Sequence, residues 1–268
     1  MNAALVARDI SISFGGIMAL DRAGIEVRPG AIVGLIGRNG SGKSTLFNCI
    51  TGFLKPASGC IQIDGHDIAG QPPHSVVRVG VARTFQTPRI DFKITVRQAV
   101  LCGLFPMVRR RFAAAVLGLP TARREERELQ RRADEVIREL DMHALADLEI
   151  GKLSMGRVRM VEVARAIASN ATYLLLDEPA AGLSRAEQEI LAREIRQLAD
   201  RGIGVLLVEH NFSLIRMLCD RVTVLDSGRI LFEGTPAETA RDQKVLQTYL
   251  GAAAEVSAPT GATALGEN

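Results

Sequence analysis

The feature that most constrains the fold of this chain is a glycine-rich stretch near its amino end. Its spacing fits G-x-x-x-x-G-K-[ST], the pattern of a phosphate-binding loop. An apolar run at residues 31–36 precedes it and is typical of a buried strand, and the run at 45–50 that follows is helix-like. Strand, loop and helix together predict an α/β fold. The stretch consists of Gly37, Arg38, Asn39, Gly40, Ser41, Gly42, Lys43, Ser44 and Thr45.

The residue types of this loop suit a triphosphate bound together with Mg²⁺. Glycines let backbone N–H groups turn inward and approach the phosphates closely. The helix that begins near Ser44 directs the positive end of its dipole to the same place. We expect Lys43 to reach the β and γ phosphates and the hydroxyl of Ser44 to hold Mg²⁺. The alternative is a glycine-rich turn that binds nothing, and the flanking strand and helix disfavour it.

Length and composition narrow the class of protein. A chain of 268 residues, 47% of them hydrophobic, can bury the core of one large domain or of a domain with an inserted lobe. The net charge of +3 is small, and without a basic patch no nucleic-acid partner is expected. The four cysteines are scattered without a C-x-x-C pair, as is typical of small buried residues in a reducing compartment.

The sequence contains no stretch with the roughly 18 apolar residues that a membrane-spanning helix needs. The apolar segment at 112–119 is too short, and Arg8 and Asp9 interrupt the apolar start that a signal peptide requires. We therefore expect a cytosolic chain, which is compatible with a position on a membrane protein.

An acidic motif follows a second apolar strand. The run Tyr173 to Leu176 leads directly into Asp177, Glu178 and Pro179. Beside a phosphate-binding loop, Asp177 is suited to the Mg²⁺ shell. Glu178 lies one residue further along and is suited to polarising an attacking water as a general base. The alternative is a strand that merely ends in an acidic turn.

Two polar side chains at predicted strand ends are further candidates. Gln86 follows a predicted strand at 79–85 and precedes a proline that stops regular structure, so it is placed to meet a ligand. An ordinary solvated glutamine is the alternative. His210 follows the predicted strand at 204–208, and ligands of open α/β sheets gather at the carboxyl ends of strands. We expect His210 to contact the γ-phosphate or to order the water.

Antiparallel structure is predicted near both ends of the chain. Residues 5–14 and 17–27 are expected to form paired strands, because apolar and polar residues alternate there. A hairpin is expected within 221–233, followed by one helix at 236–250. Phe14 offers an aromatic face on which a purine ring can stack, and an ordinary core or turn aromatic fits its local sequence equally well.

The pattern between these regions becomes helical. Apolar residues recur at helical spacing from 94 to 148, most clearly within 129–140. Six arginines and six acidic residues are mixed within 123–139, which indicates a solvated helix surface with i,i+4 pairs. Ser154, followed by Gly156, opens the next predicted helix, whose amino end can receive an anion. A simple N-cap is the alternative role for Ser154.

These patterns predict three parts of the chain. Residues 1–87 and 166–250 are expected to form a nucleotide-binding core together with an antiparallel β lobe. Residues 88–165 are expected to form an inserted helical lobe. Residues 251–268, rich in Ala, Gly, Ser, Thr and Pro, are predicted to be a disordered tail.

Taken in order, the motifs resemble those of the nucleotide-binding subunit of an ATP-binding cassette (ABC) transporter. They match the family's aromatic loop, Walker A motif, glutamine loop, signature, Walker B motif, D-loop and switch histidine. The matching residues are Phe14, 37–45, Gln86, Leu153 to Arg157, Asp177-Glu178, Ala181 to Ser184 and His210. The resemblance implies an α/β fold with a RecA-like P-loop NTPase core, an antiparallel β subdomain and an inserted α-helical subdomain.

The resemblance also implies a reaction, the hydrolysis of MgATP. Lys43 would stabilise charge, Glu178 would orient the water and His210 would support the transition state. Gln86 would join Ser44 and Asp177 around Mg²⁺ and report the nucleotide state to the helical lobe.

In this family two subunits face each other head to tail, and Ser154 and Gly156 of one subunit complete the ATP site of the other. The second ATPase subunit can be another copy or a related chain, and we favour a heterodimer. Integral-membrane permease subunits are the other implied partners, with room for a periplasmic or extracellular binding protein. The implied location is the cytoplasmic face of the membrane.

Finer features resemble the branched-chain amino-acid importer branch of the family. These are Arg83 to Gln86, an arginine-rich linker after Pro120, the segment Val208 to Asn211, and the ending Tyr249 to Gly251. A lipopolysaccharide-exporter ATPase shares some of them. A soluble ABC ATPase that works on nucleic acid or protein machinery and a scaffold that does not hydrolyse are the remaining alternatives.

Two positions of the signature depart from the usual L-S-G-G-Q. Met155 replaces the first Gly and adds bulk where backbone approaches phosphate, and Arg157 replaces the Gln and adds a cation that can compensate in part. Ser184 stands where the D-loop often has Asp or Asn. We therefore predict an asymmetric pair in which the site that borrows this chain's signature is the weaker one.

Overall fold

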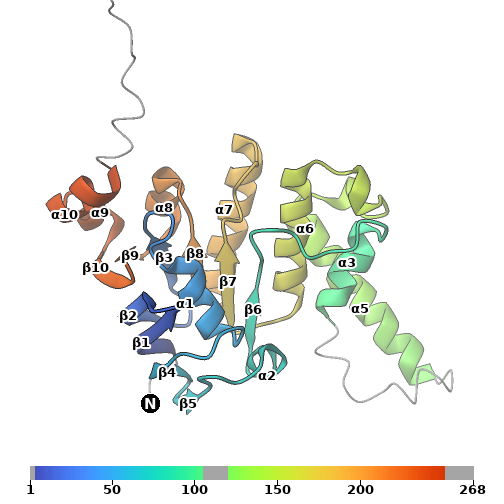
Figure 1. The fold of residues 1–268 in the computed structure, drawn as a ribbon. Helices are drawn as coiled ribbons and strands as arrows, with labels where there is room; N and C mark the ends of the chain where they lie inside the picture. Colours follow the sequence, from blue (N-terminus) through green and yellow to red (C-terminus); the bar gives the residue numbers. More distant parts are fainter. Residues whose placement is uncertain (1–3, 105–119, 251–268) are drawn as a thin grey trace, which may run out of the picture.

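The computed structural model describes residues 4–104 and 120–250 and contains two β-sheets with helices around them (Figure 1). The larger sheet has six strands in the order β10-β9-β3-β8-β7-β6, and the smaller has four in the order β2-β1-β4-β5. The α/β class is therefore confirmed. The strands of the larger sheet are β3 (Ile32–Ile36), β6 (Val81–Arg83), β7 (Tyr173–Asp177), β8 (Gly204–Val208), β9 (Arg221–Asp226) and β10 (Arg229–Gly234).

The middle of the larger sheet is parallel and fully buried. β3 pairs in parallel with β8 and β9, and β7 pairs in parallel with β8 and β6. Every residue of β3, β7 and β8 is buried, which explains why these strands are almost continuously apolar rather than alternating. The carboxyl ends of these strands lie at one edge of the sheet, where ligands of open α/β sheets bind.

The smaller sheet is antiparallel, and the predicted pairing of 5–14 with 17–27 is confirmed. Apolar and polar residues alternate along its strands because one face of the sheet is buried and the other is exposed. Leu5, Ile10 and Leu20 lie in the core, and Phe47 of the first helix packs in the same cluster. Its strands are β1 (Leu5–Phe14), β2 (Ile17–Val27), β4 (Ser58–Ile63) and β5 (His66–Asp67).

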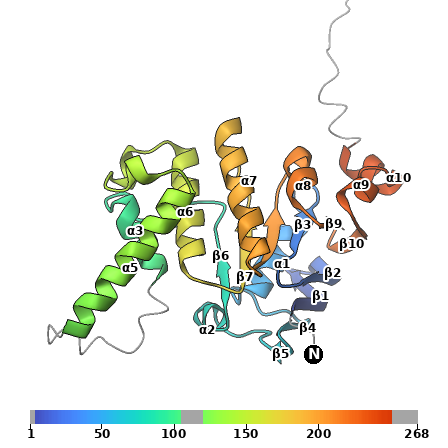
Figure 2. The same ribbon diagram turned by 180° about the vertical axis from the view of Figure 1, so that it is seen from behind.

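Helices cover the sheets, and α3, α5 and α6 gather together on one side of the molecule, beyond β6 (Figures 1 and 2). The longer helices are α1 (Lys43–Ile50), α3 (Val96–Gly103), α5 (Pro120–Glu139), α6 (Met155–Ala168), α7 (Arg185–Asp200) and α8 (Phe212–Leu218). Shorter pieces are α2 (Pro73–Arg78), η2 (His143–Leu145), η3 (Ile150–Lys152), α9 (Pro236–Thr239), α10 (Gln243–Val245) and η4 (Leu246–Leu250). Within the described residues, no helix is long and apolar enough to cross a membrane.

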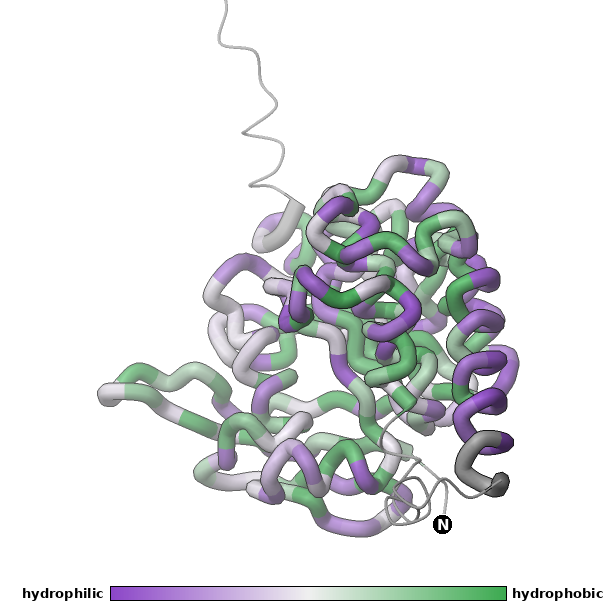
Figure 3. The backbone as a smooth tube through the Cα atoms, turned by 90° about the vertical axis from the view of Figure 1, so that its right-hand side faces the viewer, coloured by the Kyte–Doolittle hydropathy of each residue, from purple (hydrophilic) through white to green (hydrophobic). Residues whose placement is uncertain are grey.

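Helix α5 has the predicted solvated surface, and its mixture of hydrophilic and hydrophobic residues is visible on the right of Figure 3. Ala133 and Ile137 are buried against the core, and Leu140 just beyond the helix is buried with them. On the outer face Arg131 pairs with Glu128 one turn earlier and with Glu135 one turn later. Such exposed pairs keep the outer face of a helix polar and add little stability, typically ~0.3–0.5 kcal/mol each.

Two boundaries differ from the sequence-based predictions. The strand predicted at 79–85 is shorter, Val81–Arg83, and it begins after Gly80, which has a positive φ. The single helix predicted at 236–250 is wrong, since it is broken after α9. Asp242 accepts a hydrogen bond from the Val245 backbone N and starts α10, so the chain re-initiates there.

Other predictions are not tested by the fold. The apolar segment 112–119 and the predicted tail at 251–268 lie outside the described residues. Helix α6 runs from Met155 to Ala168 and so continues past residue 165, where we placed the end of the helical lobe. The division of the chain into lobes stays a prediction.

Candidate active site

A cavity of about 370 Å³ lies where the phosphate-binding loop meets the ends of β7 and β8. Segments separated by more than a hundred residues in the sequence contribute to it, which is the convergence that the motifs predicted. Ten of the predicted site residues line it, namely Asn39, Gly40, Gly42, Lys43, Ser44, Thr45, Gln86, Asp177, Glu178 and His210.

The glycines of the loop are required by close packing and by backbone conformation. A Cβ on Gly37 would lie 2.1 Å from the Leu225 carbonyl oxygen, so no side chain fits there. Gly42, the residue before α1, has φ of +109°, a value that residues with a Cβ rarely adopt. The loop therefore follows a path on which its amides can surround an anion at the start of α1.

Lys43 is buried at the first position of α1. Its Nζ donates to the carbonyl oxygens of Gly37 at 2.7 Å and Arg38 at 2.9 Å, which holds the side chain along the loop. Burial lowers the pKa of the lysine, and the nearby Glu178 and Asp177 carboxylates act in the opposite direction. The ammonium group thus stands between the loop and the two acidic residues.

Asp177 ends β7 and is buried beside Arg83, a residue whose role the sequence did not reveal. Burial raises the pKa of Asp177, and the guanidinium of Arg83, 3.3 Å from Oδ2, acts against that rise. Nη1 of Arg83 donates two hydrogen bonds that hold the side chain in turn. Asn48 in α1 accepts one at 2.6 Å, and Thr51 at the end of α1 accepts the other at 3.0 Å. In the sequence alone, the motif Arg83 to Gln86 indicates only a branch of the family.

Three rings surround the same guanidinium. Arg83 lies over the rings of Phe47, Phe53 and Phe85, with its central carbon 5.1 to 5.8 Å from their centroids. A guanidinium is weakly hydrated and stacks well on aromatic faces, so a buried cation is tolerated here. The Arg83 guanidinium that pairs with Asp177 is therefore held both by hydrogen bonds and by aromatic rings.

Glu178, Gln86 and His210 meet at a single carboxylate oxygen. Oε1 of Glu178 lies 2.9 Å from Nε2 of His210 and accepts a hydrogen bond from Nε2 of Gln86 at 3.2 Å. These residues follow three different strands, so only the assembled sheet brings them together. The geometry places a candidate base and its two orienting groups at the cavity that Lys43 and Ser44 also line.

Glu209, which precedes the histidine, is a second residue that sequence reasoning missed. Its buried carboxylate accepts hydrogen bonds from the backbone N of Ala180 at 2.9 Å and of His210 at 3.3 Å. Burial raises its pKa, and these backbone hydrogen bonds act to lower it. Glu209 thereby joins the turn after β8 to the turn after β7, and so fixes the spacing between His210 and Glu178.

The remaining predicted residues do not line this cavity. Phe14 lies at the β1–β2 turn with 47% of its surface exposed, available to a ring but not packed in the core. Ser154 is the N-cap of α6 and accepts from the Arg157 backbone N at 3.3 Å, so the simple capping role fits. A Cβ on Gly156 would lie 2.8 Å from the Gly182 carbonyl oxygen. Of the loop, Gly37, Arg38 and Ser41 shape the path without lining the cavity.

Arg157 is engaged within its own chain. Its Nε lies 2.8 Å from Oε1 of Glu187 in the first turn of α7, and that glutamate also accepts hydrogen bonds from Ser184. Burial raises the pKa of Glu187, and the hydrogen bonds from Ser184 and the Arg157 charge outweigh this and lower it. We expected Arg157 to supply a cation to a neighbouring phosphate, and here its charge is shared with a carboxylate instead.

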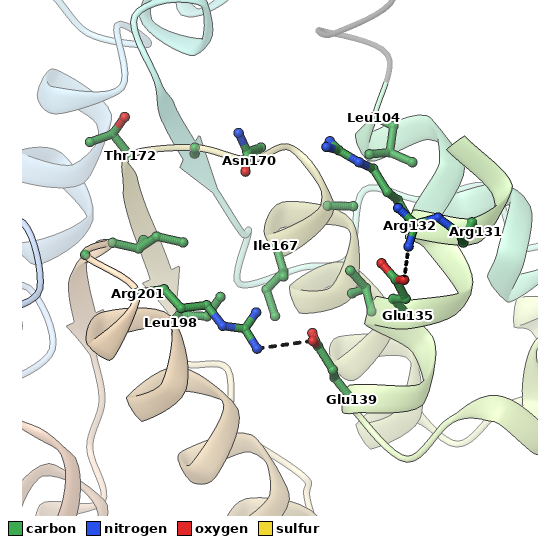
Figure 4. A pocket seen from close by; sticks show the side chains of 15 residues that line it. Leu104, Arg131, Arg132, Glu135, Glu139, Ile167, Asn170, Thr172, Leu198 and Arg201 are labelled. Carbon is green, nitrogen blue, oxygen red and sulfur yellow. Dashed lines mark hydrogen bonds and ion pairs between the residues drawn. The ribbon is translucent and has the colours of Figure 1, made fainter. Parts of the chain in front are cut away.

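A second cavity, of about 530 Å³, lies between α5, α6 and α7 (Figure 4). Arg201 at the end of α7 reaches Glu139 at the end of α5 with an N–O distance of 3.3 Å. Leu198 and Ile167 are among the side chains that line it (Figure 4). None of the sequence motifs contributes to it.

Comparison with known proteins decides the family. The family described as ABC transporter matches residues 20–181, more than half of the chain. The chain belongs to the ABC transporter family. As a member it is an ATP-hydrolysing cassette, and the nucleotide that its loop binds is ATP.

Curated relatives of this ABC ATPase match it nearly end to end. It is 36% identical over 245 residues to the high-affinity branched-chain amino acid transport ATP-binding protein BraF of Pseudomonas aeruginosa, covering 91% of this chain and 96% of BraF. It is 34% identical to the corresponding protein LivG of Salmonella typhimurium, covering 93% and 98%. It is also 34% identical to the lipopolysaccharide export system ATP-binding protein LptB of Acidithiobacillus ferridurans, covering 94% and 98%.

Solved structures agree with this assignment. A nucleotide-free ATP-binding cassette from an ABC transporter superposes with a TM-score of 0.79 at 30% identity, over 93% of this chain and 99% of the other. An ABC transporter cassette in its ADP conformation gives the same TM-score at 31% identity, over 94% and 99%. The P-loop NTPase core with its antiparallel and helical additions is therefore the fold of this ABC ATPase.

Proposed function

We propose that this ABC ATPase powers the import of branched-chain amino acids, or of a related small polar solute, through a partner permease. The names of BraF and LivG describe high-affinity branched-chain amino acid transport, and both relatives match almost the full chain. LptB, at the same identity as LivG, supports lipopolysaccharide export as the second candidate. Substrate selectivity in either case lies with the permease rather than with the cavity described above.

The convergence of His210 and Gln86 on one oxygen of Glu178 carries the proposed mechanism. A carboxylate held in this way is oriented to accept the proton of a water that attacks the γ-phosphorus in line. Lys43 and the start of α1 hold the phosphates and offset their charge. His210 sits within hydrogen-bond reach of the base and supports its orientation as the reaction proceeds.

The same cavity suits Mg²⁺. Ser44, Asp177 and Gln86 line it together, and their side chains carry hard oxygen donors of the kind that this ion prefers. When bound with ATP, the ion would offset negative charge on the phosphates. Arg83 engages only Oδ2 of Asp177 among the two carboxylate oxygens, in keeping with a ligand role for the other.

We further propose that a second ATPase subunit, with a heterodimer favoured, completes each site. Ser154 and Gly156 stand at the start of α6, outside this chain's own cavity, as residues that serve a neighbouring site would. The partner permease would hold the pair at the cytoplasmic face of a membrane, and a binding protein outside the membrane would deliver solute to an importer.

Contacts after Gln86 support its role as a reporter of nucleotide state. The backbone N of Arg89 donates to Oε1 of Glu162 in α6 at 2.9 Å, and Arg165 of the same helix donates to the Arg89 carbonyl oxygen at 3.0 Å. A displacement of Gln86 would therefore be transmitted to α6, because Arg89, which contacts that helix, follows Gln86 closely in the chain. The predicted lobes, 1–87 with 166–250 and 88–165, would then move relative to each other.

The test is reconstitution of the ATPase with its partner permease. Proteoliposomes containing the complex, MgATP and labelled leucine should accumulate leucine and release phosphate together. A complex carrying Glu178→Gln should do neither while still binding ATP, and Arg185→Ala on the exposed start of α7 should behave like the wild type. Phosphate release that responds to lipopolysaccharide but not to amino acids would favour the exporter instead.

A further inference from the structure

The backbone of Glu178 is unusual for a residue with a large side chain. Its φ is +49°, in the left-handed region that disfavours residues with a Cβ, and it follows directly on the last residue of β7. Its backbone N donates to the Val208 carbonyl oxygen of the neighbouring strand at 2.9 Å. A conformation of this kind persists where the surroundings hold it in place.

The carbonyl oxygen of Glu178 is held by a side chain of the neighbouring helix α6. Within its own turn it accepts only a long hydrogen bond, 3.3 Å, from the Ala181 backbone N. Nη1 of Arg159, in the second turn of α6, donates to the same oxygen at 3.1 Å, and this contact is partly buried. A charged donor in a partly buried position gives the stronger of such hydrogen bonds.

The start of α6 touches the rest of this segment as well. A Cβ on Gly156 would be 2.8 Å from the Gly182 carbonyl oxygen, so helix and loop are in direct contact. Arg157 pairs with Glu187, at the far end of the segment 178–187. The helix that begins with the signature therefore holds this segment at its beginning, middle and end.

We propose that Arg159 is a positioning residue for the catalytic carboxylate of Glu178. It fixes the carbonyl end of the residue while His210 and Gln86 fix the carboxylate end, so the side chain is aimed from both directions. Because Arg159 belongs to the helix capped by Ser154, a shift of that helix would also change the aim of Glu178 in the same chain. The proposal rests on the general-base role of Glu178 proposed above.

Kinetics of the full chain in its complex, with saturating MgATP, provide the test. Arg159→Ala should lower kcat by about 10- to 100-fold, because a displacement of about 1 Å at a reacting group has that effect. The KM for ATP should change less than about threefold, since the phosphate-binding residues are untouched, and Arg159→Lys should recover part of the rate. Arg185→Ala, whose side chain is 94% exposed, is the matched control and should not change kcat.

A double substitution separates positioning from a general loss of structure. If Arg159 acts through the Glu178 side chain, Arg159→Ala combined with Glu178→Gln should turn over no more slowly than Glu178→Gln alone. Multiplied effects would overturn the proposal, and so would an unchanged kcat in Arg159→Ala. Wild-type hydrolysis by Glu178→Gln would instead refute the proposed role of Glu178.

Hydrogen exchange tests the contact without turnover. In the nucleotide-free chain, Arg159→Lys and Arg159→Ala should speed amide exchange within 178–183 and leave β3 and α7 unchanged, with thermal unfolding monitored in parallel. If Arg159→Ala unfolds, Arg159→Lys carries the measurement. Unchanged exchange within 178–183 in a folded variant would overturn the proposal.

Discussion

One chain of this family can contribute two half-sites to ATP binding: the cavity that holds its own nucleotide, and the signature that completes a neighbouring site. The two half-sites differ sharply in this protein. The residues around the first cavity bring ten of the predicted site residues together, with Glu178, Gln86 and His210 joined at one oxygen. The signature half, Leu153 to Arg157, departs from the usual sequence and directs its charge into its own chain, where Arg157 pairs with Glu187. The motifs that line this chain's own cavity keep the usual pattern, whereas the signature that it would lend to a second subunit is altered.

This difference favours a pair of unequal sites. Met155 has 55% of its surface exposed at the start of α6, where it would face a neighbouring nucleotide rather than fill the core. Arg157 contributes to the packing of α6 on α7 instead of offering a free cation. A heterodimer whose other subunit carries an intact signature would then have one strong site, built on this chain's Lys43 and Glu178.

Removal of divalent metal should have the largest effect on the cavity half. With excess chelator, phosphate release should fall by at least about 100-fold, since charge on the transferred phosphoryl group is then offset only by Lys43 and the loop amides. Fluorescent ATP should still bind, more weakly, because the loop amides and Lys43 remain. Full recovery on adding Mg²⁺ is the control, and undiminished hydrolysis in chelator would exclude the proposed metal site.

The substitution Glu178→Gln should have the next largest effect on ATP hydrolysis. The loss of the base should lower kcat by about 10²- to 10⁴-fold, the usual range for a positioned general base. The amide keeps the shape of the side chain, so ATP should remain bound and hold the paired subunits together. Size-exclusion chromatography with ATP should show the paired form, and a variant that hydrolyses ATP at the normal rate would remove Glu178 from its role.

Restoring the usual signature tests the altered half directly. Met155→Gly together with Arg157→Gln should raise turnover of the assembled complex several-fold, because bulk near the neighbouring phosphate is removed. Glu187 keeps its hydrogen bonds to Ser184, so α7 retains its N-cap. Arg157→Gln alone is the control for losing the ion pair. A fall or no change in turnover would mean that the altered signature does not weaken the site that borrows it.

The smallest effect is expected outside both halves. Arg201→Ala removes the contact with Glu139 across the second cavity, where 55% of the Arg201 side chain and 33% of the Glu139 side chain are exposed. Exposed ion pairs of this kind contribute about 0.2–1 kcal/mol, so thermal unfolding should shift by only a few degrees at most, with kcat unchanged. A marked loss of ATPase activity would show that this cleft, too, communicates with the site.

Sequence patterns predicted the parts of the site that depend on local spacing. The loop from Gly37 to Thr45, and the acidic pair after β7, carry their chemistry in adjacent residues and were recognisable without a structure. His210 and Gln86 were predictable because both follow apolar strands, and parallel strands end at the same edge of a sheet.

Residues that act through tertiary packing could not be found in this way. Arg83 reaches Asp177 across 94 positions, and Arg159 reaches Glu178 only because α6 packs beside the end of β7. Nothing in the local sequence of an arginine on a helix indicates which carbonyl it will contact. The partner of Arg157 and the break before Asp242 were missed for the same reason, since each depends on a contact or a cap rather than on periodicity.

The close approach between Gly37 and Leu225 has a consequence for how the protein acquires its activity. The nucleotide loop is made early in synthesis, yet it rests on the end of β9, and the Gly228 backbone N donates to the Ser41 carbonyl oxygen at 2.9 Å. A nascent chain shorter than about 230 residues lacks this support, so the loop would be incomplete on the ribosome. Competence to bind ATP should therefore arrive only after β9 and the turn that follows it have been synthesised.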